Sequence, residues 1–288
     1  MIASGPTLMD DSTPQDCLDI IDRLGASEAV PRLVLDFLNG RATEATTVAS
    51  GEATGKSDHV LTVCVGNNQM AAEAARGCAE AMGFEAALVS TQLAGKSHQV
   101  AAMFVELASN VYRQYKARLQ SSAGLGSDSP QRSSVAGLEE SSLDGVWDSV
   151  HRAVSQRSPV CLIGAGETTL AVTGRGRGGR NQEMALTAAA MMAGRPVFDQ
   201  LLAAGFRAVF LSGGTDGQDG PTDAAGALAD PRQIAVARQA GMDPDTFLQD
   251  NNSYSFYERL NAGQDHLRTG LTGTNVMDIQ LLLIEPPN

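Results

Sequence analysis

The chain has 288 residues, enough for one large or two ordinary domains, and 43% of them are hydrophobic, so a buried core can form. The formal net charge of -12 argues against nucleic acid or an anionic membrane surface as the main partner. No apolar stretch is long enough to span a bilayer, and the N-terminus lacks a basic-then-apolar signal sequence. The four cysteines show no C-x-x-C spacing, which is typical of reduced thiols in the cytoplasm.

The N-terminal part of the sequence predicts two helices that follow a loop over residues 1–11. Pro14, directly after Ser12 and Thr13, predicts the start of the first helix, and Gly25 predicts its end. A short second helix is predicted over residues 31–39, with Gly40 as its terminator.

Residues 60–89 predict a β-α-β unit. The continuous apolar run at 60–65 is typical of a strand buried on both faces of a parallel sheet, and residues 84–89 predict the next strand. The turn that follows the first strand lies where such folds usually bind ligands, although a plain turn is an equal alternative. It contains Gly66, Asn67 and Asn68.

Strands and helices alternate along the whole chain, which predicts the α/β class. Residues 96–119 predict a long amphipathic helix, and the Ser/Gly-rich stretch 120–142 predicts a disordered linker. We therefore expect two α/β domains, over residues 1–119 and 143–288. Only two convincing strands precede the linker, so we expect the first domain to be incomplete.

The stretch from Val160 to Met192 predicts a glycine-rich loop that leads into a helix. Strands are expected at 160–163 and 170–173, followed by the glycine-rich run and a helix from Asn181. Glycines allow close approach to a ligand, and a helix N-terminus favours an anion. The loop also supplies guanidinium groups suited to phosphate or carboxylate, so it predicts an anion site. These groups belong to Arg175, Arg177 and Arg180.

An acidic glycine-rich loop follows the strand predicted at 206–211. Its carboxylates, Asp216, Asp219 and Asp223, have a spacing that can hold Mg²⁺ together with substrate phosphates. The equally weighted alternative is that they form Asx turns and cap a helix. Further helices are predicted over 231–239, 244–249 and 254–260, and a final strand is predicted over 276–284.

Two other patterns resemble nucleotide motifs without the required context. Gly174-x-Gly-x-x-Gly179 matches the dinucleotide fingerprint, but the acidic residue at the usual distance, Asp199, precedes the next strand instead of ending it. Nicotinamide binding is therefore disfavoured. Residues 51–57 (GEATGKS) are one residue short of a phosphate loop and follow no strand, so they predict a surface turn.

Taken together, the motifs resemble those of the glycerate kinase family that carries the MOFRL domain. The second half of the chain matches almost end to end, and the long acidic-loop motif is highly specific. The matching stretches are Ile2–Thr7 (IASGPT), Val65–Asn68 (VGNN), Gly166–Thr169 (GETT), Gly176–Glu183 (GRGGRNQE), Thr215–Ala227 (TDGQDGPTDAAGA), Asn251–Tyr254 (NNSY) and Thr269–Val276 (TGLTGTNV).

The resemblance implies ATP-dependent phosphorylation of D-glycerate with Mg²⁺ in a cleft between the two α/β domains, and 2-phosphoglycerate as the expected product. It implies catalytic roles for Arg180, Asp216 and Asp219, and metal binding by Asp216, Asp219 and Asp223. Gly66, Asn67 and Asn68 would contact the nucleotide. The residues implied in binding substrate or phosphate are Ser4, Gly5, Thr7, Glu167, Thr168, Arg175, Arg177, Gly178, Gly179, Asn181, Thr274 and Asn275.

The sequence departs from the family pattern at its start. In the family, the loop corresponding to Ile2–Thr7 lies well inside the first domain and an essential lysine precedes it, whereas here the chain begins at that loop. We therefore expect an N-terminally truncated form, such as a splice isoform, whose own activity stays open. The long linker suggests an animal protein. We expect a cytoplasmic location, with the mitochondrion as the alternative for a full-length form.

Two further hypotheses remain. One is an oxidoreductase that acts on hydroxypyruvate, an activity long attached to relatives of this family. The other is a non-catalytic fragment that binds a ligand or forms a homodimer through uncovered sheet surface. Binding of NAD(P)H would favour the first.

Overall fold

The computed structural model describes residues 12–48, 61, 63–122, 134–138 and 140–287. The chain divides into two compact units, Met1–Val65 and Gly66–Asn288, which are described separately here. The expected site residues Ser4, Gly5 and Thr7, and the expected surface turn at 51–57, lie outside the described residues.

The described part of the first unit contains two helices, α1 (Pro14–Arg23) and α2 (Arg32–Val48). The start of α1 was correctly predicted. The hydroxyl of Thr13 accepts a hydrogen bond from the N–H of Asp16, and the Asp16 carboxylate accepts one from the backbone N–H of Thr13. The prediction that α2 ends at Gly40 was wrong, since the helix continues to Val48. A glycine inside a helix costs only about 1 kcal/mol relative to alanine, which the neighbouring residues can offset.

The strand predicted over residues 60–65 is not formed by the part of this run that the structure describes. Leu61, Val63 and Val65 are exposed by 88%, 65% and 87%, and the described residues of this segment pair with no strand. The predicted β-α-β unit is therefore wrong, because an apolar run becomes a buried strand only where a neighbouring strand pairs with it.

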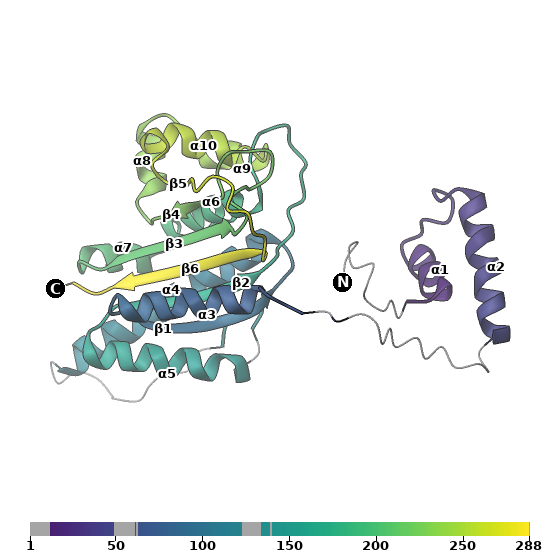
Figure 1. Ribbon diagram of the computed structural model, residues 1–288. Helices are drawn as coiled ribbons and strands as arrows, with labels where there is room; N and C mark the ends of the chain where they lie inside the picture. Colours follow the sequence, from purple (N-terminus) through teal and green to yellow (C-terminus); the bar gives the residue numbers. More distant parts are fainter. Residues whose placement is uncertain (1–11, 49–60, 62, 123–133, 139, 288) are drawn as a thin grey trace. The chain divides into compact units, whose positions relative to one another are not determined.

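The second unit is built on a six-stranded sheet with the order β1-β2-β6-β3-β4-β5 (Figure 1). β1 and β2 are parallel, and every other neighbouring pair is antiparallel. The α/β class is thus confirmed. The strands are β1 (Glu85–Leu93), β2 (Val160–Gly166), β3 (Arg207–Gly214), β4 (Gly226–Ala229), β5 (His266–Leu267) and β6 (Asp278–Glu285).

The last strand, β6, lies between β2 and β3 and brings their carboxyl ends together (Figure 1). Asp278, the first residue of β6, pairs with Gly166 at the end of β2 and with Gly214 at the end of β3. We call this the Asp278 end of the sheet. The carboxyl end of β1 lies there as well, because β1 is parallel to β2.

Helices cover both faces of the sheet (Figure 1). The larger core packs on one face against α4, α5 and α6, where the rings of Phe104 and Phe210 lie 5.0 Å apart. A smaller apolar cluster lies between α3 and the opposite face, around Ala72 and Ile163. The helices of this unit are α3 (Asn68–Ala81), α4 (Ser97–Ser122), α5 (Glu140–Gln156), α6 (Arg180–Ala193), α7 (Pro196–Ala203), α8 (Gln233–Gln239), α9 (Pro244–Gln249) and α10 (Ser253–Arg259), followed by the 3-10 helix η1 (Leu260–Gly263).

The expected linker over residues 120–142 falls within this second unit. β1 precedes it and β2 follows it, yet the two strands pair along their length. Helix α4 continues to Ser122 and α5 begins at Glu140, while residues 123–133 lie outside the described part. Segments on both sides of the stretch therefore share one sheet and one core.

Candidate functional site

Arg180, the first residue of α6, is bound by two carboxylates at the Asp278 end of the sheet. Its Nε donates to Asp278 Oδ2 at 2.6 Å and its Nη2 donates to Asp278 Oδ1 at 2.9 Å. Nη2 also lies 3.1 Å from Glu167 Oε1. The hydrogen bonds with Asp278 raise the pKa of the Arg180 guanidinium, so this residue stays charged. A fork-shaped donor held on both sides is suited to binding a planar or tetrahedral anion.

Asp278 is fully buried, whereas the Arg180 side chain is one-third exposed and the Glu167 side chain is 53% exposed. The sequence reasoning missed Asp278. The sequence carries only a weak signal for it, because a carboxylate in a largely apolar strand needs a partner but nothing near it in sequence shows which one. Its neighbours across the sheet, Gly166 and Gly214, have no side chains.

Asp219 caps helix α6 from the acidic loop. Its carboxylate accepts hydrogen bonds from the backbone N–H groups of Asn181 and Gln182 at 3.1 and 2.9 Å, and from the side-chain amide of Gln182 at 3.0 Å. Burial raises the pKa of this carboxyl group, while the hydrogen bonds from Gln182 and Asn181 lower it in part. A side chain at Gly179 would overlap the Asp219 carboxylate, so glycine is required there. The helix-cap alternative therefore describes Asp219.

Because Asp219 caps α6, the first amides of this helix are not free to bind a ligand. The sequence predicted that the first amides of α6 would receive a ligand anion, but two of them already bind Asp219. The guanidinium of Arg180 is the group at this helix end that remains partly exposed to solvent.

The other two carboxylates of the acidic loop face elsewhere. Asp216 accepts weak hydrogen bonds from Gln218 N at 3.1 Å and Asn275 Nδ2 at 3.4 Å. Asp223 accepts from the hydroxyl of Tyr254 at 2.7 Å, which lowers the pKa of its carboxyl group, and it also lies near Arg268. The expected trio of metal ligands is therefore not brought together. Among the described residues, no group of three or more His, Cys, Asp or Glu side chains could hold a metal ion.

Asp216 does lie close to Asp278. An ideal Cβ built on Gly214 would lie 3.0 Å from Asp216 Oδ1 and 3.6 Å from Asp278 Oδ1. Asp216, partly exposed to solvent, and Asp278, which is buried beside Arg180, thus both lie near Gly214 at the end of β3.

The glycine-rich loop packs against the segment that precedes α10. The predicted strand over 170–173 is wrong, because the Asn251 side chain accepts hydrogen bonds from Thr173 N and Gly174 N at 2.8 and 2.9 Å and holds this segment as a loop. Side chains at the next three alternate glycines would overlap neighbouring residues of the 250–253 segment. These glycines are Gly174, Gly176 and Gly178, of which Gly174 and Gly176 also belong to the dinucleotide-like pattern. They serve close packing of the chain on itself.

The two arginines of this loop have different environments. The Arg177 guanidinium lies 4.2 Å from the centre of the Tyr254 ring and donates to Pro221 O at 3.2 Å. Arg175 is held through its backbone N–H by Asp250, and its exposed side chain has no ion pair with the described residues. Arg177 therefore contributes to packing, while Arg175 is open to solvent.

The other expected site residues around α6 and β6 differ in burial and in hydrogen bonding. Asn181 is fully buried and accepts from Ser212 Oγ at 2.6 Å. Thr168 is 3% exposed, and its hydroxyl has no hydrogen-bond partner among the described residues. Thr274 and Asn275 lie on the exposed turn before β6, where Asn275 contacts Asp216.

The expected nucleotide-binding turn begins α3. The Asn67 side chain caps the helix by accepting from Met70 N at 2.8 Å, and the Asn68 amide donates to the carbonyl of Thr91. Because Thr91 is near the carboxyl end of β1, the N-terminus of α3 lies at the Asp278 end of the sheet. Gly66 precedes it and is exposed.

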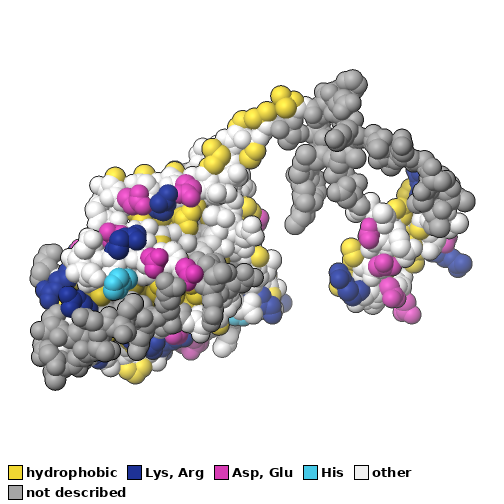
Figure 2. Space-filling view, turned by 90° about the horizontal axis from the view of Figure 1, so that it is seen from below, with side chains coloured by type: hydrophobic (Ala, Val, Ile, Leu, Met, Phe, Trp, Pro, Cys, Tyr) yellow, Lys and Arg dark blue, Asp and Glu magenta, His cyan; other side chains and the backbone are white. Residues whose placement is uncertain are grey.

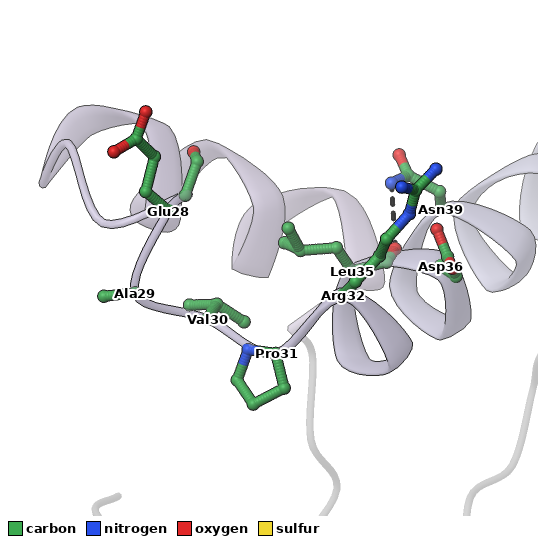
Figure 3. A pocket seen from close by; sticks show the side chains of 9 residues that line it. Glu28, Ala29, Val30, Pro31, Arg32, Leu35, Asp36 and Asn39 are labelled. Atoms are coloured by element: carbon green, nitrogen blue, oxygen red, sulfur yellow. Dashed lines mark hydrogen bonds between the residues drawn. The ribbon is translucent and has the colours of Figure 1, made fainter.

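A separate pocket of about 630 Å³ lies in the first unit, between the loop after α1 and the start of α2 (Figure 3). Its charged side chains, Glu28, Arg32 and Asp36, are exposed. The pocket brings together no buried polar group, and its labelled lining is a mixture of short apolar and surface side chains. It does not have the character of a catalytic site.

None of the helices in the described ranges is both long and apolar enough to cross a bilayer. On the face shown in Figure 2, acidic and basic side chains of the second unit are interspersed with uncharged surface.

Comparison with known proteins identifies the chain's relatives. The MOFRL family matches residues 160–278, and a domain of unknown function, DUF4147, matches residues 1–39. Glycerate kinase from Macaca fascicularis is 38% identical over 286 residues, which cover 99% of this chain and 69% of the relative. The human glycerate kinase is 38% identical over 99% of this chain and 52% of its own length.

More distant relatives come from a thermophile. The D-glycerate 2-kinase of Thermotoga maritima is 29% identical over 99% of this chain and 53% of its own length. The crystal structure of a Thermotoga maritima glycerate kinase matches with a TM-score of 0.57 and 27% identity, over 98% of this chain and 52% of the solved chain. The chain spans about half the length of most curated relatives it matches. These relatives are named as kinases, which confirms the enzyme class expected for the family. The chain belongs to the glycerate kinase family.

Proposed function

We propose that this chain takes part in the ATP-dependent phosphorylation of D-glycerate, with phosphoryl transfer at the Asp278 end of the sheet. The observation that carries the proposal is Arg180, which is fixed bidentately by a fully buried carboxylate and still reaches solvent. Phosphoryl transfer requires positioned positive charge more than a protein nucleophile, and Arg180 supplies it. The names of the relatives support glycerate as the acceptor.

Within this proposal Arg180 binds the carboxylate of glycerate or the phosphoryl group in transfer. Its Nη1 forms no hydrogen bond with the described residues, so this nitrogen can donate to a ligand without breaking the pair with Asp278. The amides at the start of α6 orient Asp219 and through it the loop that carries Asp216. Arg175 is a second solvent-exposed cation on the segment that leads to α6.

Asp216 is the carboxylate of the acidic loop that fits Mg²⁺. It is half-exposed, its hydrogen bond from Asn275 is long at 3.4 Å, and Mg²⁺ takes one or two carboxylates together with waters and substrate phosphates. Asp219 and Asp223 do not fit, because their oxygens are engaged by α6 and by Tyr254. Mg²⁺, when bound, would neutralise phosphate charge. Asp216 would hold it or orient the attacking hydroxyl.

The remaining assignments concern the nucleotide, the substrate loop, the product and the location. The N-terminus of α3, with Gly66, Asn67 and Asn68, lies at the same end of the sheet and is proposed for the nucleotide. The loop that contains Ser4, Gly5 and Thr7 is proposed for the substrate on the motif alone. We propose 2-phosphoglycerate as the product, since one relative is named a D-glycerate 2-kinase, and the cytoplasm as the location.

The proposal is tested by a coupled ADP-release assay with D-glycerate and MgATP. Arg180→Ala should abolish turnover. Arg207→Ala should not, because Arg207 is an exposed arginine in an ion pair with Glu285 at the opposite end of β3. Turnover that survives in Arg180→Ala would contradict the proposed site. Hydroxypyruvate-dependent oxidation of NAD(P)H by the same sample, without ADP release, would favour the oxidoreductase alternative.

No turnover from a wild-type sample that melts cooperatively would contradict catalysis by this chain alone. A glycerate-binding role would then remain to be measured by titration. A sample without a cooperative transition would show that the isolated chain does not fold, and the assay would then be repeated in a chain of the relatives' full length with the matching arginine replaced.

A further inference from the structure

Asp278 and Glu167 both bind Arg180, but they differ in how easily each can release the guanidinium. Asp278 is fully buried and engages both Nε and Nη2, so breaking this pair would leave a buried charge without a partner. Glu167 contacts Nη2 alone, and its side chain is 53% exposed, where water can solvate the carboxylate after it leaves. Asp278 is therefore a fixed partner of the guanidinium, and Glu167 is an exchangeable one.

The backbone around Glu167 allows its side chain to leave without other changes. Its N–H donates to the carbonyl of Leu93 at 2.9 Å, and Thr169, two residues later, pairs with Lys96 between β1 and α4. The main chain is thus fixed on both sides of Glu167. Rotation of the side chain alone would uncover the outer part of the Arg180 guanidinium.

The local charge favours such a change when an anion binds. Asp278, Glu167 and Asp219 are the carboxylates whose charges act on the single guanidinium of Arg180. A ligand carboxylate or phosphoryl group would add further negative charge beside Glu167, and like charges at close range disfavour each other. The Glu167 carboxylate that contacts Arg180 is the same chemical group as the acid group of a small hydroxy acid such as glycerate.

We propose that Glu167 is an internal competitor that covers Arg180 in the free protein and is displaced by the anionic group of the ligand. This inference rests on the proposed function of Arg180 as the anion-binding group. It differs from the expectation that Glu167 binds the substrate, because it assigns Glu167 an effect that weakens binding.

The test measures the dissociation constants of D-glycerate and of inorganic phosphate by calorimetric titration of the full chain at one ionic strength. Glu167→Gln should bind both anions about two- to fivefold more tightly, since an exposed ion pair no longer has to be broken. Asp278→Asn should bind them more weakly. The matched control is Glu106→Gln, which removes the same charge from an exposed pair with Arg195 on another part of the unit. It should change neither constant.

The tighter anion binding expected for Glu167→Gln must depend on Arg180. The double variant Glu167→Gln/Arg180→Ala should bind no more tightly than Arg180→Ala, a coupling that a general change of stability would not produce. Weaker or unchanged binding by Glu167→Gln, or absence of binding of both anions by wild type and variant alike, would overturn the proposal. If phosphate binding responds as expected but glycerate does not bind, the competitor role stands and the proposed substrate fails. If the wild type turns over glycerate but Glu167→Gln binds no tighter, the proposed function stands and the competitor role fails.

Discussion

The carboxylate of Asp219 accepts two hydrogen bonds from Gln182, one from its backbone N–H at 2.9 Å and one from its side-chain amide at 3.0 Å. The contact joins the loop after β3 to the first turn of α6 across 37 residues of sequence. It therefore fixes the acidic loop relative to the helix that carries Arg180.

The Asp219 cap should be a major contribution to stability. Asp219→Asn should lower the free energy of unfolding by about 1–3 kcal/mol, because the charge that complements the helix N-terminus is lost and one buried N–H loses its acceptor. Urea denaturation measures this change. Asp223→Asn, at an exposed carboxylate of the same loop, is the control and should have a much smaller effect. Equal effects of the two substitutions would refute the assignment.

Replacing glycine by alanine should change the stability in opposite directions in the glycine-rich loop and in helix α3. Gly174→Ala should destabilise the protein by about 1–3 kcal/mol, because its Cβ would overlap the backbone of Asp250 and force the two segments apart. Gly77→Ala, in the middle of α3 with open space around it, should stabilise by about 0.5–1 kcal/mol through helix propensity. Thermal unfolding of both variants checks the pair. A harmless Gly174→Ala would mean that the loop is not closely packed.

His266 should make stability depend on pH. Burial, with the Arg268 charge as a smaller cause, lowers the pKa of this imidazole from 6.5 to about 4. A group whose pKa is lower in the folded state than in the unfolded state binds fewer protons when folded. Its contribution to stability is therefore complete above pH 6.5 and is lost as the pH falls toward 4.

The measurement compares wild type with His266→Phe, which keeps an aromatic ring against Tyr254 and Tyr257. The stability of the variant relative to wild type should rise as the pH falls through this window. His98→Gln, at an exposed histidine, should show no such trend. A difference between wild type and His266→Phe that does not vary with pH would show that the ring charges freely in the folded protein.

Asp278 should act through Arg180. Asp278→Asn should reduce turnover of D-glycerate by roughly 10- to 100-fold, since a misplaced catalytic group loses most of its effect. Steady-state kinetics measure this loss. The coupling is checked by calorimetric titration with inorganic phosphate, where Asp278→Asn combined with Arg180→Ala should bind no more weakly than Arg180→Ala alone, because both changes remove the same positioned charge. Additive losses of phosphate affinity would show that Asp278 has a separate role.

Elements governed by local signals were predictable from the sequence. The Thr13-Pro14 start of α1, the Asp243-Pro244 start of α9 and the apolar run of β6 carry their own caps or patterns, and the structure places them close to the expected bounds. Elements that depend on a distant partner were not predictable. The run at 60–65 lacks a described neighbour, and the run at 170–173 is held as a loop by Asn251.

The candidate site shows the same limit. Its motifs could be found because glycines, arginines and aspartates gather at strand ends, and Arg180 and Asp216 were among them. Which carboxylate would cap a helix and which would face solvent depended on pairings across the sheet. Asp278 was missed because its importance comes from pairing with β2 and β3, and that topology is not encoded in any short stretch.

The position of β6 also has a consequence for biosynthesis. Among the strands of the described residues, β6 leaves the ribosome last, yet it is the one that joins β2 to β3. Until it is inserted, each of those strands lacks a neighbour on that side, and Arg180 lacks its buried counterion. Sheet closure and assembly of the charged centre are thus a single late event after translation of the rest of the unit. A nascent chain stalled before residue 278 would be exposed to chaperones and proteases without a complete site.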